Sequence, residues 1–507
     1  MSHPLYQAHR VTPALAWATG VNCFSTIQFG FNLAATNAPA KVIACKKHLE
    51  SPGGYADSFW GHMGTDQCIP MSFNDIALMS TMFTLGGFLS SVVAGSPLVS
   101  SVVGRKRIQI ICAVLFFCGS TFLCIANTRW AFLAGRALTG LASGVSIVVA
   151  PIMVNELAPF NHRGLMGSLL QFGVAFGILA AQLTALSWSN DHQWRWIFAF
   201  GAGLALTQLV LLFTITESPK WMITHRGNVS KATRTLHTLR SEARSVNHEI
   251  QHWREITNNS KPPVTEESPL LDSEDDLPST FTTLSPSKSR RGSIDPSSVS
   301  MYEYVTTSQY KKEVIAVGLI MTAQQLCGMN AINFYGVSIL ESVMPYGFNV
   351  LYITSSIALC NVVAMLAVSP FIDKVGRKPL LITSLAIMGV SSCFISIGML
   401  TQHGVVASIA CFTFVIGFSL GLGQIPMLMV SELSSHQTIG VAQSFGTMLN
   451  WGANVAVAYG FPQLQLLLDK HDFFVFFGIC FVYIFLIYCF VPETQGRLNY
   501  DDIWTSL

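Results

Sequence analysis

The sequence predicts an all-α membrane protein of twelve transmembrane helices, built as two related halves of six helices each. Of its 507 residues, 51% are hydrophobic and only 11% are charged, whereas roughly a quarter of the residues in a typical soluble domain are charged. The apolar residues gather in runs of about 20, the length at which a helix crosses a bilayer. Short motifs that recur between the two halves of the chain are the third observation behind this prediction.

Twelve apolar runs can be placed along the chain. The first six expected spans cover residues 14–38, 76–98, 108–126, 130–153, 166–187 and 195–216. The other six cover residues 313–340, 350–372, 379–400, 405–431, 438–462 and 472–492. The first run is too long for a signal peptide and lacks a small-residue cleavage site, so we expect it to remain as a span.

Basic residues set the expected orientation in the membrane. The clusters GRKR (104–107) and KVGRK (374–378) follow even-numbered spans, and Lys and Arg favour the cytosolic side of short loops. These loops and both termini are therefore expected in the cytosol. The expected domains are an N-terminal half (1–219), a cytosolic linker (220–312) and a C-terminal half (313–507).

Three motifs of the first half recur in the second half at nearly one offset, 272 or 276 residues. These are Gly104-Arg105-Lys106 with Gly376-Arg377-Lys378, Glu156-Leu157 with Glu432-Leu433, and Glu217 with Glu493. A nearly constant offset indicates duplication of a six-helix unit. Repeats of this size place a binding site near the middle of the membrane, between halves that can rock.

The segment QQLCGMNAINFYG, residues 324–336, puts uncharged amide side chains into an expected span. A polar side chain without a partner in hydrocarbon costs on the order of a few kcal/mol, so Gln324, Gln325 and Asn330 should face protein or a wet cavity. Carboxamides both donate and accept hydrogen bonds, which suits a neutral polyol. The competing interpretation is that they hydrogen-bond one helix to another.

Motifs along nearly the whole chain resemble the sugar porters of the major facilitator superfamily, which include the facilitative hexose carriers. They are FGFNLAATNAP, GRALTG, NELAPFNHRG, LLQFG with GILAAQ, ESPK, QQLCGMN, DKVGRK, GLGQIP, LNW and PETQGR, and only the 240–300 insert lies outside the resemblance. The chain is most similar to fungal sugar porters of vacuolar membranes, which favours the vacuolar over the plasma membrane. The resemblance implies these sugar-contacting residues: Gln171, Gln182, Gln324, Gln325, Asn330, Asn361, Asn450 and Trp451.

Three positions depart from the family pattern. Met427 follows Pro426 where most hexose carriers have Trp, and Ser419 stands where a Glu is common. These changes put glucose itself in doubt and leave another hexose or a small polyol open. Asn32 stands where proton-driven members carry an Asp; because an amide does not titrate, facilitated diffusion is favoured, with proton coupling through another acid as the alternative.

The resemblance also implies a cytosolic gate of acid–base pairs that part when that side opens. Its expected members are Arg105, Arg136, Glu156, Arg163, Asp373, Arg377 and Glu432. Positive-inside topology alone explains Arg105 but not the acids. Ser101, Val102 and Ile439 replace charged residues of this motif, so we expect a weakened lock.

The long insert carries three short patterns. HEIQH (248–252) matches a zinc-protease pattern, but it is short and isolated, so we interpret it as a solvated helix and expect no metal or cofactor. Residues 261–300 are rich in Ser, Pro and acids and are expected to be disordered. In that segment, Glu266 before Leu270 and Leu271 resembles a signal for a sorting adaptor, and RRGS makes Ser293 a candidate kinase site.

Cys45 and Cys68 lie in the expected non-cytosolic loop between the first two spans, where a disulfide and two free thiols are both open. The net charge of +2 indicates no nucleic-acid partner. No GxxxxGK[ST] loop occurs, which argues against an ATP-driven pump.

The leading hypothesis is therefore a non-enzymatic, alternating-access carrier of a monosaccharide. The rival is a sugar sensor that signals through the insert.

Overall fold

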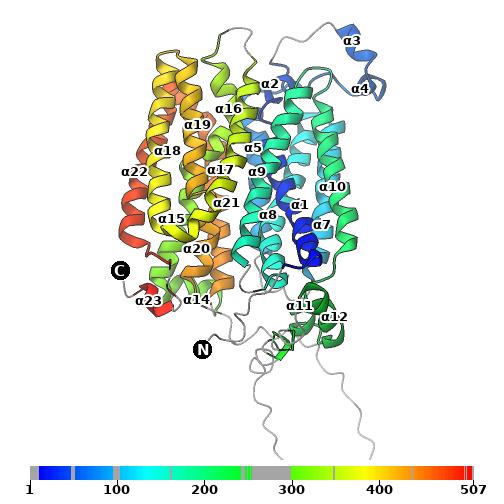
Figure 1. The fold of residues 1–507 in the computed structure, drawn as a ribbon. Coiled ribbons are helices and arrows are strands. Elements are labelled where there is room, and N and C mark those ends of the chain that lie inside the picture. Colours follow the sequence, from blue (N-terminus) through cyan, green and yellow to red (C-terminus); the bar gives the residue numbers. More distant parts are fainter. Residues whose placement is uncertain are drawn as a thin grey trace, which may run out of the picture.

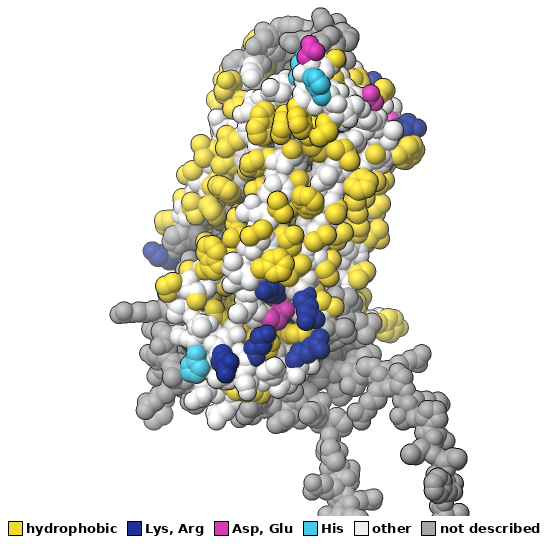
Figure 2. Space-filling view, turned by 90° about the vertical axis from the view of Figure 1, so that its right-hand side faces the viewer, with side chains coloured by type: hydrophobic (Ala, Val, Ile, Leu, Met, Phe, Trp, Pro, Cys, Tyr) yellow, Lys and Arg dark blue, Asp and Glu magenta, His cyan; other side chains and the backbone are white. Residues whose placement is uncertain are grey.

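The computed structural model describes residues 11–46, 52–94, 103–159, 163–240, 246–247, 249–251, 253, 299–345, 349–435, 438–495, 497 and 500–504. Figure 1 shows two bundles of long, roughly parallel helices side by side, one from each half of the sequence. Figure 2 shows a broad apolar band around the middle of one face, as expected for a surface that meets lipid tails.

The N-terminal bundle contains six long helices. They are α1 (Pro13–Ala34), α5 (Phe73–Ala94), α7 (Arg105–Ile125), α8 (Arg129–Leu157), α9 (Arg163–Trp188) and α10 (Arg195–Thr214). The short helices α2 (Ala40–Ile43), α3 (Pro52–Ala56) and α4 (Phe59–His62) lie in the α1–α5 loop. Figure 1 shows them at one end of the molecule, which we call the outer end.

The C-terminal bundle has the same plan, with two of its six spans broken into two helices each. The seventh expected span is α15 (Lys311–Leu326) plus α16 (Met329–Glu341), and the tenth is α19 (Gly404–Leu420) plus α20 (Ile425–Leu433). The unbroken helices are α17 (Val350–Val375), α18 (Arg377–Leu400), α21 (Ile439–Leu468) and α22 (Asp472–Phe490). A short 3-10 helix, η4 (Asp469–His471), joins the last two.

These elements make up the twelve predicted spans. Within the described residues, ten segments are long and apolar enough to cross a membrane, and one of them, Ile439–Phe490, contains both α21 and α22. The remaining span, α1, does not reach that apolarity because buried polar residues such as Asn22, Gln28 and Asn32 line it. The chain is an all-helical, multi-pass membrane protein.

Smaller helices gather at the opposite end, which we call the cytosolic end after the expected orientation. They are α11 (Pro219–Thr224), α12 (Val229–Leu239), α14 (Met301–Thr306), η3 (Ser308–Tyr310) and α23 (Tyr500–Trp504). Figure 1 shows α11 and α12 below the N-terminal bundle and α14 and α23 below the C-terminal one.

The two ends of the linker are attached to different halves. On the N-terminal side, the Arg240 guanidinium donates to the Leu157 carbonyl at the end of α8 at 2.7 Å, and the Thr12 hydroxyl donates to the Leu239 carbonyl at 3.1 Å. On the C-terminal side, the ring of Tyr304 in α14 packs against Phe445 of α21, with centroids 5.9 Å apart.

Candidate functional site

The break between α15 and α16 gathers the amide side chains of the seventh span. Gly328 adopts φ 98°, which favours glycine, and a Cβ there would lie 2.8 Å from the ring of Phe476. The chain therefore turns at this residue. Gln324 and Gln325 lie in the last turn of α15 and Asn330 lies in the first turn of α16, so the break brings them together near α21.

Six carboxamides form one hydrogen-bonded group, which we call the amide network. Its members are Gln324, Gln325, Asn330 and Asn333 of the seventh span and Asn450 and Asn454 of α21. Asn450 is the hub: it donates to the Gln324 Oε1 at 2.8 Å and accepts from the Gln325 Nε2 at 3.0 Å. Asn330 donates to Gln325 and, at 2.8 Å, to Asn454. Asn333 donates to Asn330 at 3.2 Å, which places it at the outer edge of the network.

A cavity lies beside this network, between the outer halves of the two bundles. Its polar lining residues are Asn37 after α1, Gln182 of α9, Asn333 of α16, and Thr354 and Asn361 of α17. Asn333 thus belongs to both the network and the cavity wall. Both halves supply amides to one chamber, and the described residues of its wall include no charged side chain. This lining suits a neutral ligand with several hydroxyl groups.

Among the described residues that line the cavity, Gln182 has a buried side-chain atom without a hydrogen-bond partner. Its side chain is only 5% exposed, and its Oε1 has no hydrogen-bond partner within the described structure. A buried amide oxygen without a partner costs roughly 1–3 kcal/mol. Since Gln182 lines the cavity, a donor carried by a ligand or by water would remove this cost.

The other predicted site residues differ in their surroundings. Asn361 lines the cavity and accepts from the Ser419 hydroxyl at 2.8 Å. Gln171 is half-buried on α9 and is absent from the cavity lining. Trp451 is buried outside the cavity: it lies against Gly87 of α5, and its ring is 5.7 Å from that of Phe29. The indole therefore packs one half against the other, and only a rearrangement would let it contact a ligand in the cavity.

Sequence reasoning missed two members of this region. Asn37 lines the cavity and Asn454 completes the network. Asn37 follows the end of α1 in the quoted motif FGFNLAATNAP, and Asn454 lies one helical turn beyond Asn450. Their spacing relative to the predicted residues is the signal that would have identified them.

Hydrogen bonds between described residues of the two halves lie in the outer half of the molecule. Asn37 donates to the Ile332 carbonyl at 3.5 Å and accepts from the Val337 N–H at 3.3 Å. The Lys41 ammonium pairs with Glu341 at 2.6 Å. Deeper in the membrane, the Ser355 hydroxyl donates to the Gln182 carbonyl at 3.3 Å. These contacts close the outer end over the cavity.

The repeated charged motifs form matching pairs at the cytosolic end, each inside one half. Arg105 holds Glu156 through two N–H groups at 3.1 and 3.2 Å, and Arg377 donates to Glu432 at 3.0 Å. Glu217 and Glu493, which lie at the same 276-residue offset in the sequence, accept from the backbone N–H groups of Lys106 and Lys378 respectively. The internal repeat thus has a structural counterpart. The side chains of Arg163 and Asp373 lie outside the described part.

The prediction that Arg136 belongs to the cytosolic gate is wrong. Arg136 lies in the second turn of α8, which begins at the outer end, and is fully buried. Its guanidinium donates to the carbonyls of Met79 at 3.0 Å and Asn32 at 2.7 Å and lies 4.5 Å from the Phe83 ring centre. It ties α8 to α5 and α1 far from Glu156.

Asn32, in the position of interest for proton coupling, is a neutral group whose side-chain nitrogen is hydrogen-bonded. Its side chain donates to the Gln28 carbonyl at 2.9 Å. Arg136, whose Nη2 has no hydrogen-bond partner among the described residues, therefore faces the Asn32 backbone rather than a carboxylate.

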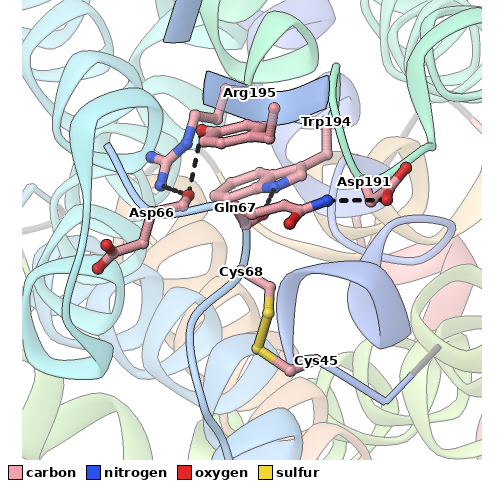
Figure 3. Close-up of a disulfide and its surroundings, with 8 residues drawn as sticks. Cys45, Asp66, Gln67, Cys68, Asp191, Trp194 and Arg195 are labelled. Atoms are coloured by element: carbon pink, nitrogen blue, oxygen red, sulfur yellow. Dashed lines mark hydrogen bonds between the residues drawn. A yellow bond between two sulfur atoms is a disulfide. The ribbon is translucent and has the colours of Figure 1, made fainter. Parts of the chain in front are cut away.

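The outer loop is held by a disulfide between Cys45 and Cys68 (Figure 3). Next to it, the Trp194 indole donates to the Gln67 carbonyl at 2.9 Å and Arg195 donates to the Asp66 carbonyl at 2.7 Å. These hydrogen bonds fix the loop to the start of α10. Cys45 lies four residues after Lys41, which takes part in the outer closure.

The remaining sequence patterns stay untested or lose support. Glu249 of the HEIQH pattern is ion-paired with Arg240 at 2.8 and 3.0 Å, so it is occupied as a structural acid; His248 and His252 lie outside the described residues. The described part contains no group of three or more His, Cys, Asp and Glu residues placed to hold a metal. Glu266, Leu270, Leu271 and Ser293 also lie outside it.

Two six-helix bundles, broken helices beside a central amide-lined cavity and paired cytosolic motifs define a transporter of the major facilitator type. The chain belongs to the "Sugar (and other) transporter" family, whose model matches residues 18–501. It is therefore a non-enzymatic carrier protein with the twelve-helix major facilitator fold.

Similar proteins agree with this assignment. The "Probable metabolite transport protein YBR241C" of Saccharomyces cerevisiae is 32% identical, over 98% of this chain and 96% of the relative. The "Vacuolar protein sorting-associated protein 73" of the same organism is 31% identical, over 98% and 97%. Among solved structures, the proton:xylose symporter XylE bound to 6-bromo-6-deoxy-D-glucose has a TM-score of 0.71 at 20% identity, over 97% of this chain and 99% of that chain.

Proposed function

We propose that this protein carries a hexose-like monosaccharide across a membrane by alternating access, as facilitated diffusion. The observation that carries the proposal is the unpartnered Gln182 oxygen in a cavity to which both halves contribute amides. A ring of hydroxyl groups supplies the donors and acceptors that such a wall requires.

In the proposed binding mode, side chains of both halves contact the sugar. Gln182 accepts from one sugar hydroxyl, while Asn361 and Asn333 offer further amide groups from the C-terminal half. The amide network behind Asn333 holds that side chain in place, and we propose that it exchanges internal hydrogen bonds for bonds to the sugar. Neutral amides bind the hydroxyls without the desolvation penalty of an ion.

The conformational cycle follows from where the halves are joined. In this structure the outer contacts, including Lys41 with Glu341, close the cavity from above. Rocking the halves apart at the outer end would break these contacts, and rocking back would restore them. The Arg105–Glu156 and Arg377–Glu432 pairs lie within single halves, so we propose that they stiffen the cytosolic ends during this motion.

The proposal of facilitated diffusion without proton coupling depends on Asn32. Coupling to protons requires a group whose proton affinity differs between conformations, and an amide at this position does not titrate. Proton coupling through another acid is the first alternative. A sensor that binds sugar but moves little is the second: Met427, whose sulfur accepts from the Gln443 amide at 3.2 Å, stands where an aromatic platform was expected.

Reconstitution into liposomes separates these functions. Uptake of labelled hexose without ATP or a pH gradient, lost in Gln182→Leu but retained in Gln171→Leu, supports the proposed carrier. Uptake only with a proton gradient supports coupling, and binding without uptake supports the sensor. Absence of both binding and uptake across a panel of hexoses and small polyols would refute the proposal.

We also propose that the protein resides in the vacuolar membrane. The similar yeast protein 73 is named for vacuolar protein sorting, and the disulfide at the outer end suits an oxidising lumen or exterior. A fluorescent fusion that colocalises with a plasma-membrane marker would contradict this.

A further inference from the structure

A group of basic side chains lies at the cytosolic end of the N-terminal bundle, directly below the apolar band (Figure 2). We call it the basic rim and define it as Arg107 of α7, Lys220 of α11, Arg226 after α11, and Lys231 and Arg234 of α12. All five side chains are exposed. They come from three adjacent segments, because α11 packs under the start of α7, where a Cβ on Gly104 would lie 3.3 Å from the Trp221 ring.

The positive charge of the basic rim is not neutralised by acids of the described structure. Every described acid at this end of the N-terminal half has another partner: Glu156 pairs with Arg105, Glu249 with Arg240, and Glu217 accepts from backbone N–H groups. Cytosolic orientation needs only an excess of Lys and Arg. The five cations of the basic rim, which no described acid pairs with, are more than the membrane orientation requires.

The basic rim is continuous with a surface that meets lipid. Phe213, the next-to-last residue of α10, is 67% exposed, and Ile111 of α7 is 53% exposed. Trp17, also exposed, donates its indole N–H to the Thr214 hydroxyl at 2.9 Å, a position typical of an aromatic side chain at a membrane interface. An amphiphile whose tail lies on Ile111 and Phe213 would therefore place its headgroup at the basic rim.

We propose that the basic rim binds the headgroup of an anionic phospholipid of the cytosolic leaflet, with a preference for inositol lipids that carry phosphomonoesters. Clusters of four to eight cations next to a transmembrane helix suit multivalent lipid headgroups, and one phosphodiester would leave most of the five charges unmatched. Arginines at 226 and 234 can hold phosphate oxygens through paired N–H groups. The apolar belt above the rim favours a lipid over a soluble acidic protein.

The test uses the full-length protein in detergent and measures binding of dioctanoyl phosphatidylinositol bisphosphate by thermophoresis. Three cations are removed in Arg226→Gln/Lys231→Gln/Arg234→Gln. The matched control, Lys311→Gln/Lys312→Gln/Lys374→Gln, removes three exposed cations from the cytosolic end of the other half. We expect affinity to fall at least about tenfold in the rim variant, since each cation near an anionic surface contributes roughly a factor of five before screening, and less than twofold in the control.

Four results would overturn the proposal. They are equal loss in both variants, equal affinity for dioctanoyl phosphatidylcholine, equal affinity for the free headgroup inositol trisphosphate, and lipid binding that is seen only after residues 265–277 are deleted. The last result would mean that the chain's own acidic segment, and not a lipid, occupies the basic rim. If the triple variant fails to fold, as its melting temperature without lipid would reveal, Arg107→Gln/Lys220→Gln tests the other side of the rim with the same controls.

Discussion

The two halves of this molecule use buried amides in different ways. In the N-terminal half, Gln109 donates to the Asn22 side chain at 2.6 Å and Gln208 donates to the Ser25 hydroxyl at 3.0 Å, and each amide joins α1 to α7 or α10. In the C-terminal half, the amide network gathers at a helix break and reaches the cavity through Asn333. Gln109 and Gln208 thus fasten helices inside the N-terminal half, whereas the amides at the helix break of the C-terminal half form one connected network that reaches the chamber.

This difference shows that a helix break allows several buried amides to join one network. Gln109, inside the continuous helix α7, makes its side-chain hydrogen bond to a single residue of α1. Beside the turn at Gly328, the ends of α15 and α16 present amides from several directions, and they can exchange partners.

The largest expected effect comes from Asn450→Leu, at the hub of the amide network. The change leaves the Gln324 oxygen and the Gln325 N–H group without the partner that Asn450 provides, at roughly 1–3 kcal/mol for each buried group. We expect hexose uptake in proteoliposomes to fall by at least about 100-fold. Uptake within twofold of the parent protein would remove the network from the proposed mechanism.

Gln109→Leu is the matched change in the N-terminal half. It removes the bond to Asn22, so we expect a loss of about 1–2 kcal/mol of stability and a melting temperature lower by a few degrees. The KM for sugar should not change, because Gln109 is fully buried between α7 and α1, away from the cavity. A raised KM with unchanged stability would erase the distinction between the halves.

Asn32→Asp sharpens the comparison at a buried position of α1. The new carboxylate would lie near Arg136, which has an unpartnered Nη2, and its protonation should differ between the open and closed outer states. We expect uptake to become several-fold faster under an inward proton gradient, as an order-of-magnitude effect of a coupled acid. Asn32→Ala, measured in the same vesicles, should remain insensitive to the gradient; sensitivity of the unmodified protein would contradict passive transport.

The smallest effect is expected at the exposed Lys41–Glu341 pair. Exposed ion pairs contribute about 0–1 kcal/mol, so Lys41→Glu should shift the balance between outer-closed and outer-open states by no more than about fivefold. Spin labels on α2 and α16 would report the shift as a longer distance population. The double exchange Lys41→Glu/Glu341→Lys should restore the original distance distribution. If it does not, the pair does not hold the outer end closed.

Much of the fold follows from the sequence because apolar runs and basic loops act over short stretches. The twelve spans and the family were predictable for this reason. The helix breaks at Gly328 and near Gly421 were not predictable. A glycine inside an apolar run is also compatible with a continuous helix, and the contact of Gly328 with Phe476 is visible only in the structure.

The candidate site was predictable by residue type but less so by location. Gln324, Gln325, Asn330 and Asn450 do come together, whereas Trp451 packs outside the cavity, which no spacing rule could indicate. For Arg136 the sequence did hold the answer: its span runs inward from the outer end, so a residue near its start lies far from the cytosol. The motif alone favoured the cytosolic gate, and the topology of the span contradicts it.

The separate attachment of the two linker ends has a mechanical consequence. Arg240 moves with the N-terminal bundle and Tyr304 with the C-terminal one. Between the described segments, residues 254–298 comprise 45 amino acids, whose contour length is on the order of 150 Å. Because this maximum reach exceeds a rocking displacement of the halves, the number of residues alone does not restrict the motion. We therefore expect that shortening the insert leaves turnover unaltered until its reach becomes limiting.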